Sequence, residues 1–96
     1  MPVGREDLRD ALGQLTGWVR EPRELRRSLR LDESQHAALT ERIKVVADVM
    51  QARPHIRRQG GQTHIVLRPA DGGAVTADEV RLAARIEDIY QSLRAR

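Results

Sequence analysis

A strongly periodic segment in the middle of the chain places the firmest limit on its fold. Its apolar residues recur at helical spacing, at Leu39, Ile43, Val46 and Met50. Asp32, followed three residues later by Gln35, matches the capping box that starts many helices. Pro54 disfavours helical geometry at the residue before it. We therefore predict a long helix from about Glu33 to Ala52.

The segment before this helix changes to the alternating pattern of a strand. Leucines occupy one side of it, and polar residues occupy the other: Leu25, Leu29 and Leu31 against Arg26, Ser28 and Arg30. The residues Glu21-Pro22-Arg23-Glu24 favour a turn back toward Trp18-Val19-Arg20. We predict a β-hairpin between Trp18 and Leu31.

The segment after the helix predicts a second hairpin. A short strand near His55 to Arg58 leads into a turn at Gln59-Gly60-Gly61. The returning strand, from Gln62 to Arg68, has an apolar side formed by Thr63, Ile65 and Leu67.

Helices are expected at both ends of the chain. Leu8, Ala11, Leu12 and Leu15 predict an amphipathic helix from about Arg5 to Leu15. Thr76 with Glu79 predicts a capping box for a last helix with a buried stripe of Leu82, Ile86, Ile89, Tyr90 and Leu93.

The order helix, hairpin, helix, hairpin, helix predicts an α+β fold. We expect a single domain over residues 1–96, a four-stranded antiparallel sheet with three helices on one face.

Composition narrows the classes of function. The 96-residue chain has no cysteine, which excludes disulfide and thiolate chemistry, and its three histidines lack a short metal-ligand spacing, so no metal site is expected. A net charge of +3 is compatible with nucleic-acid binding, but acidic residues interleave with the arginines and only Trp18 and Tyr90 are available for base stacking. Without a membrane-length apolar run or a signal-peptide core, a cytoplasmic protein is expected.

Several stretches resemble the pterin-4a-carbinolamine dehydratase family. The segment from Asp71 to Ile86 is similar to the closing pattern Thr-His-Asp-x-Gly-Gly-Leu-Thr-x-x-Asp-x-x-Leu-Ala-x-x-Ile of that family, and its opening Thr-His is replaced by Pro69 and Ala70. Three further stretches resemble the family in order and spacing: Leu15-Thr16-Gly17-Trp18, Leu25-x-Arg27-x-Leu29-x-Leu31, and Asp48 to His55. The resemblance implies the same α-β-β-α-β-β-α fold.

The catalytic residues of the family are not retained. In the family, two adjacent histidines before a proline and the histidine of Thr-His surround the pterin and act as acids and bases while the 4a-hydroxyl leaves as water. The corresponding residues here are Ala52, Arg53 and Ala70. Alanine cannot transfer protons, and arginine stays protonated and is a poor proton shuttle. A pterin would be a substrate, so the resemblance implies no cofactor.

Other residues can be assigned to an active site only as alternatives. His55 follows Pro54 beside the expected mouth of the family's pocket, and His64 is predicted on the strand side opposite Thr63. Together with Arg53 and Asp48, they are the candidate catalytic residues, while for His55 and His64 an exposed, purely structural role stays open. His36 is expected on a solvated helix surface.

The stretch between Asp48 and Asp71 contains four arginines and no acidic residue, a local charge of +4. Arg57, Arg58 and Arg68, with Asp78 of the closing segment, are the residues expected to bind a ligand or partner. Arginine matches carboxylates and phosphates, so an anionic small molecule or an acidic protein surface would fit. Solvation of an exposed sheet edge explains the same arginines without a ligand.

Two functions fit this sequence. The first is a dehydratase-like protein that has lost the standard reaction and acts as an oligomeric binding, assembly or regulatory module, as a homodimer or homotetramer. The second is an active enzyme, either a 4a-hydroxytetrahydrobiopterin dehydratase or a dehydratase or isomerase that uses the same pocket with His55 and Arg53. A membrane partner is not expected, and nucleic acid ranks third.

Overall fold

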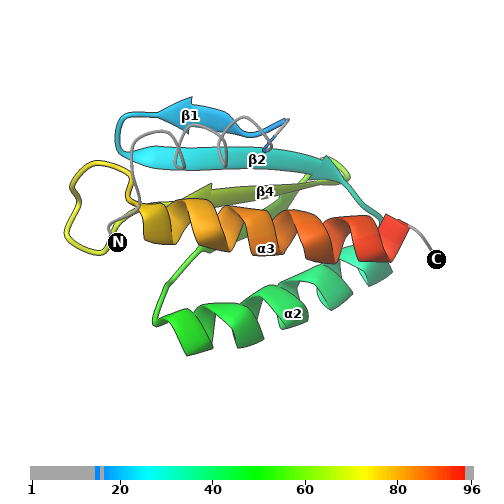
Figure 1. The fold of residues 1–96 in the computed structure, drawn as a ribbon. Coiled ribbons are helices and arrows are strands. Elements are labelled where there is room, and N and C mark those ends of the chain that lie inside the picture. Colours follow the sequence, from blue (N-terminus) through cyan, green and yellow to red (C-terminus); the bar gives the residue numbers. More distant parts are fainter. Residues whose placement is uncertain (1–14, 16, 95–96) are drawn as a thin grey trace.

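Two helices cover one face of a four-stranded antiparallel sheet (Figure 1). The computed structural model describes Leu15 and residues 17–94. The strands are β1 (Val19–Glu21), β2 (Glu24–Arg30), β3 (His55–Gln59) and β4 (Gln62–Leu67), and the helices are α2 (Glu33–Met50) and α3 (Ala77–Arg94). The sheet order is β1-β2-β4-β3. The expected α+β class and sheet are confirmed, while two of the three expected helices are seen and the segment of the first, residues 5–15, lies almost wholly outside the described residues.

The first hairpin has the predicted turn and the predicted sides. Glu21 pairs with Glu24 across the turn at Pro22 and Arg23. Leu25 and Leu29 of β2 are buried against the helices, whereas Arg26, Ser28 and Arg30 are exposed on the opposite side. Because β2 also pairs with β4 along its length, the two central strands carry the apolar centre of the sheet.

Helix α2 begins as its capping box predicts. The Asp32 carboxylate accepts a hydrogen bond from the Gln35 backbone N–H at 2.7 Å, and the Gln35 side chain accepts one from the Asp32 N–H at 3.1 Å. The helix ends at Met50, two residues before the predicted end. Gln51 adopts a left-handed conformation with φ of 55°, and the Ala52 N–H donates to the Ala47 carbonyl at 2.8 Å, which closes the helix before Pro54 is reached.

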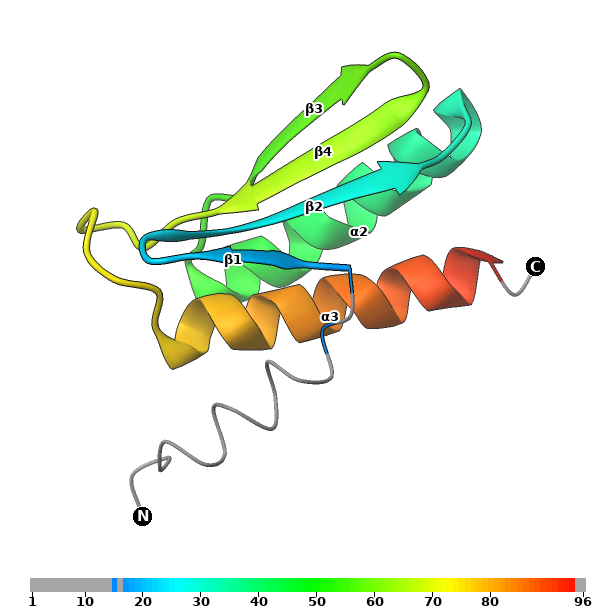
Figure 2. The same ribbon diagram turned by 90° about the horizontal axis from the view of Figure 1, so that it is seen from above.

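The second hairpin turns at Gly60 and Gly61, which have φ of 59° and 74°. A tight turn with positive φ at both central residues matches the right-handed twist of the flanking strands, and glycine adopts it without steric strain. Thr63, Ile65 and Leu67 of β4 are buried on the predicted side. Seen from above, the strands lie in front of α2 (Figure 2).

Helix α3 completes the core. The Glu79 carboxylate accepts a hydrogen bond from the Thr76 backbone N–H at 2.7 Å, which is one half of the predicted capping box. The Thr76 hydroxyl accepts from the Asp78 backbone N–H at 3.2 Å, rather than from the Glu79 backbone N–H that the other half would use. Leu82, Ile86 and Leu93 are buried as predicted, while Ile89 and Tyr90 are only partly buried. Within the described part of the chain, no helix is long and apolar enough to cross a membrane.

Candidate functional site

The positions at which the family pattern has adjacent histidines lie beside a small cavity. We call it the inner cavity; it lies where the end of α2, the end of β4 and the start of α3 meet. Its volume is about 30 Å³. Its lining residues are Met50, Ala52, Arg53, Pro54, Leu67, Arg68, Asp78, Glu79 and Leu82. The fold therefore brings together Arg53, Arg68 and Asp78, three of the residues that the sequence singled out.

The inner cavity is equipped for neither proton transfer nor binding of a bicyclic ring. None of its lining residues is a histidine, and Ala70, the third catalytic position, is exposed in the loop before α3. A volume of about 30 Å³ is that of one water molecule in the liquid, whereas ligand pockets typically enclose about 300–1,000 Å³. Dehydration needs a group that protonates the departing oxygen, and the ionisable side chains that line the inner cavity are arginines and carboxylates.

His55 and His64 lie on the sheet face that α2 and α3 leave uncovered. His64 is in β4, and its Nδ1 lies 2.8 Å from the Ser28 hydroxyl of β2. His55 begins β3 and is exposed. Both line a concave region of about 630 Å³ on this face, together with Arg26 and Arg57 among others. The prediction that His64 faces away from Thr63 is confirmed.

Asp48 and Arg53 border a different cavity, on the α2 side of the molecule. It has a volume of about 330 Å³ and is also lined by Ala52, the other position of the adjacent histidines, and by Thr40, Lys44 and Ile56. The four candidate catalytic residues therefore divide into two pairs: Asp48 with Arg53 here, and His55 with His64 on the uncovered sheet face. Neither of these two cavities is lined by all four.

Arg57 and Arg58 point to opposite faces of the sheet. Arg57 is exposed on the uncovered face, where it pairs in register with His64. Arg58 pairs with the buried Thr63, and its Nη1 donates to the Thr63 hydroxyl at 3.2 Å. The arginine-rich stretch therefore does not form one patch, because successive residues of a strand alternate between faces.

The expectation that His36 lies on a solvated helix surface is wrong. It is half-buried, and its Nδ1 lies 2.8 Å from the same Thr63 hydroxyl that Arg58 contacts. The sequence placed His36 early on α2 but carried no sign that this turn faces β4.

The remaining predicted binding residues have partners on the surface. Arg68 lies 3.2 Å from the Glu24 carboxylate, and Asp78 lies 3.5 Å from Arg81 on the next turn of α3. Arg68, Asp78 and Arg81 are exposed while Glu24 is partly buried, and ion pairs with exposed members contribute little stability. Arg68 and Asp78 therefore stay available to a stronger anionic or cationic partner.

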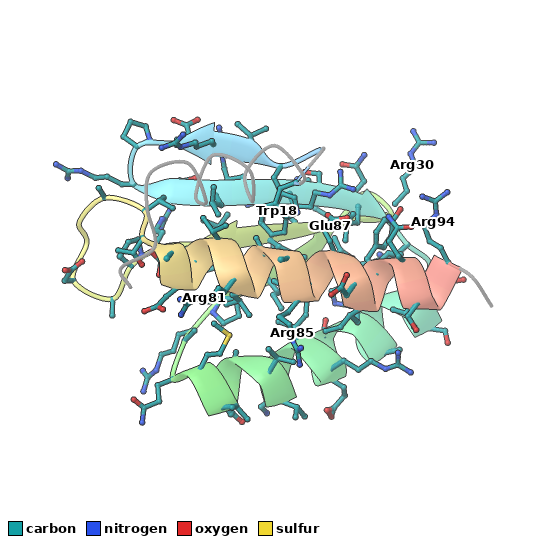
Figure 3. The ribbon with its side chains drawn as sticks, in the orientation of Figure 1. Trp18, Arg30, Arg81, Arg85, Glu87 and Arg94 are labelled. Atoms are coloured by element: carbon teal, nitrogen blue, oxygen red, sulfur yellow. The ribbon has the colours of Figure 1, made fainter. Side chains whose placement is uncertain are left out.

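A hydrogen-bonded cluster that sequence reasoning missed joins the first hairpin to α3 (Figure 3). One carboxylate oxygen of Glu87 accepts from Trp18 Nε1 at 2.7 Å and from Arg27 Nε at 2.8 Å. Gly17 makes room for this arrangement, since a Cβ there would lie 2.0 Å from Arg27 Nη1 and its φ is 92°. Gly17, Trp18 and Arg27 all belong to stretches that match the family pattern. Their partner Glu87 lies 69 residues from Trp18, so no local sequence signal connects them.

Tyr90 extends this cluster toward the end of α3. The guanidinium carbons of Arg27 and Arg94 lie 5.7 Å and 5.6 Å from the centre of its ring. Cations at this distance from an aromatic face are attracted to it. Through these contacts the cluster holds the first hairpin on α3.

The described residues contain no group of three histidine, aspartate or glutamate side chains arranged to hold a metal ion.

Comparisons with known proteins agree with this architecture. Residues 1–89 match the family model described as pterin 4 alpha carbinolamine dehydratase. A protein from Roseiflexus castenholzii, named provisionally as a pterin-4-alpha-carbinolamine dehydratase, is 29% identical over 84 residues, which are 86% of this chain and 90% of the relative. The crystal structure of a transcriptional coactivator/pterin dehydratase from Brucella melitensis has the same fold, with a TM-score of 0.75 and 19% identity over 90% of this chain and 95% of that one. By its match over residues 1–89, the chain belongs to the pterin-4-alpha-carbinolamine dehydratase family.

Proposed function

We propose that this protein has lost the standard dehydratase reaction of its family and acts by association, as a homo-oligomeric binding or assembly module. The observation that carries the proposal is the lining of the cavities beside the family's catalytic positions. The positions that hold adjacent histidines in the family pattern are Ala52 and Arg53, and neither of the two cavities that they line, of about 30 Å³ and 330 Å³, has a histidine in its lining. The groups that transfer protons in the family's reaction therefore have no counterpart there.

The alternative, an active enzyme that uses His55 and Arg53, has less support from the geometry. Arg53 lines the inner cavity and its neighbour on the α2 side, while His55 lines the opposite face of the sheet. General acid and base groups must lie within hydrogen-bond reach of the same substrate. Residues that line cavities on opposite faces of the sheet are poorly placed to meet this condition.

A surface for self-association lies between α2 and α3. A groove of about 740 Å³ is lined by Val45, Val46, Val49, Met50 and Ala84, with Asp78, Arg81 and Arg85 also contributing. Val45 and Val49 are 64% and 81% exposed, and they are two of the three large apolar residues found exposed in the described structure. A small domain gains stability by covering such a surface.

The occupant that we propose for this groove is a second copy of the chain. Glu41 and Asp48 flank the exposed valines on α2, whereas Arg81 and Arg85 leave α3 on the side of α2 (Figure 3). A two-fold axis through the groove would set the carboxylates of one copy against the arginines of the other. Two-fold pairing of this kind uses the same patch twice and is the commonest symmetry of soluble oligomers.

The loss of the reaction is tested by following dehydration of a tetrahydropterin carbinolamine with the purified protein. We expect the carbinolamine to dehydrate at its uncatalysed rate in the presence of the parent protein, and at the same rate with His55→Ala. A rate well above that background which falls in His55→Ala would establish the enzymatic alternative instead.

The association is tested by the mass of the protein in solution, measured by light scattering after size-exclusion chromatography. We expect an oligomer that dissociates to monomers in Val49→Glu, because a carboxylate would then be buried in the interface. Val19→Glu places the same charge on a valine of β1 that is 51% exposed, and it should leave the mass unchanged. A monomeric parent protein, or a Val49→Glu variant of undiminished mass, would refute pairing through this groove.

A further inference from the structure

The sheet face opposite the helices carries a second set of functional groups that the family reaction does not use. We call it the outer sheet face, and it comprises the outward-facing residues of the three strands β2, β4 and β3: Arg26, Ser28, Arg30, His64, Val66, His55 and Arg57. No described helix covers it (Figure 1). Its concave part, of about 630 Å³, falls within the range of small-molecule sites.

The strand register gathers three of these groups in one row. Ser28 lies opposite His64, and His64 lies opposite Arg57. Neighbouring strands are about 4.8 Å apart, so the row presents a hydroxyl, an imidazole and a guanidinium over roughly 10 Å. Arg26, Val66 and His55 form the adjacent row. This spacing suits a ligand group that accepts several hydrogen bonds at once.

The contact between Ser28 and His64 leaves a hydrogen-bond donor free in every protonation state. If the Ser28 hydroxyl donates to Nδ1 across the 2.8 Å separation, the neutral imidazole keeps its proton on Nε2. If Nδ1 donates instead, the Ser28 hydroxyl proton is free. A protonated His64 offers Nε2–H together with the hydroxyl. The pair is therefore a donor toward the concave region whichever tautomer is present.

The charge of this region is positive, and one of its cations is uncompensated. Arg57 has no ion-pair or hydrogen-bond partner among residues 17–94, whereas Arg26 and Arg68 both contact Glu24, at 3.3 Å and 3.2 Å. No acidic residue is among those that line the concave region. A guanidinium beside neutral donors is a common arrangement for binding phosphate oxygens.

We propose that the outer sheet face binds a small molecule through a phosphate monoester, held by Arg57, His64 and Ser28. The inference concerns a face other than the inner cavity, so it does not depend on the loss of dehydration. A single-stranded nucleic acid would present the same phosphates, but it is bound by stacking on aromatic side chains. The chain has one tryptophan and no phenylalanine, and Trp18 and its one tyrosine, Tyr90, belong to the cluster at α3.

The test is a titration of the full-length protein with inorganic phosphate and with a sugar monophosphate, followed by backbone amide chemical shifts at constant ionic strength set with chloride. We expect saturable shifts at residues 27–29, 56–58 and 63–65. Arg57→Gln should weaken the binding about tenfold, since it removes the charge-assisted contacts. Arg58→Gln makes the same change one residue away on the opposite face and should bind as tightly as the parent, with circular dichroism confirming that both variants are folded.

Three outcomes would overturn the proposal. The first is a set of shifts that grows linearly with phosphate and matches that of chloride alone. The second is equal weakening in Arg57→Gln and Arg58→Gln, which would indicate a general charge effect. The third is a single-stranded oligonucleotide that saturates the same amides at lower concentration than the sugar monophosphate, which would assign the face to nucleic acid.

Discussion

A dehydratase active site has its histidines at the catalytic positions, whereas in this protein the catalytic positions and the two sheet histidines lie on opposite faces of the sheet. The face covered by α2 and α3 contains the family's catalytic positions, Ala52 and Arg53, and the two cavities that they line have no histidine. The outer sheet face has two histidines, an arginine without a side-chain partner among the described residues, and a region of about 630 Å³. The presence of histidines in a sequence therefore says little about chemistry until the face that each one occupies is known.

The largest difference between the faces should appear in stability. Ile65→Ala removes a fully buried side chain of the covered face and should lower the free energy of unfolding by about 3 kcal/mol. Val66→Ala, at the next residue of β4, shortens a half-buried side chain of the outer sheet face and should cost less than about 1 kcal/mol. Urea unfolding measures both, and equal losses would mean that the outer sheet face is covered in solution.

A smaller effect is expected at the cluster that joins the first hairpin to α3. Glu87→Gln keeps the shape of the side chain but removes the charge that binds Arg27 and Trp18, both at hydrogen-bond distance. Because the Arg27 and Glu87 side chains are only 18% and 16% exposed, we expect a loss of about 1.5 kcal/mol. Asp88→Asn neutralises the exposed carboxylate of the following residue and should change stability by less than about 0.5 kcal/mol. An equal loss in the two variants would show that net charge, rather than the cluster, is responsible.

The smallest effects should differ in sign at two threonines of the covered side. Thr63→Val removes the hydroxyl that His36 and Arg58 both contact, so it should destabilise the protein by about 1 kcal/mol. The hydroxyl of Thr40 on α2 is buried and has no hydrogen-bond partner among the described residues, so Thr40→Val should be neutral or stabilising by up to about 1 kcal/mol. Thermal unfolding compares them, and destabilisation of similar size at both sites would mean that the Thr40 hydroxyl is satisfied in solution.

The elements of this fold were predictable because their signals are local. The Asp32 and Gln35 capping box, the Gly60-Gly61 turn and the alternation of Leu25 and Leu29 with polar residues each act over a few residues. The end of α2 was predicted two residues too late, because the left-handed conformation of Gln51 has no composition signal. Sequence alone could not reveal contacts between distant segments, such as His36 with Thr63 or Trp18 with Glu87.

The candidate site was predicted less well than the fold. Ala52 and Arg53, the positions to which the family pattern points, line the inner cavity, and Arg68 and Asp78 also line it. The four arginines between Asp48 and Asp71 were treated as one basic patch, although the alternation of strand residues already implied that Arg57 and Arg58 would separate. Charge counted along a sequence does not show how it is distributed over a sheet.

The contact between Trp18 and Glu87 has a practical consequence for following the folding of this protein. The chain has a single tryptophan, so its intrinsic emission comes mainly from one indole. That indole donates to a carboxylate on the last helix, 69 residues further along. Tryptophan fluorescence therefore reports the docking of α3 onto the first hairpin, and detachment of that helix should be visible optically without any added label.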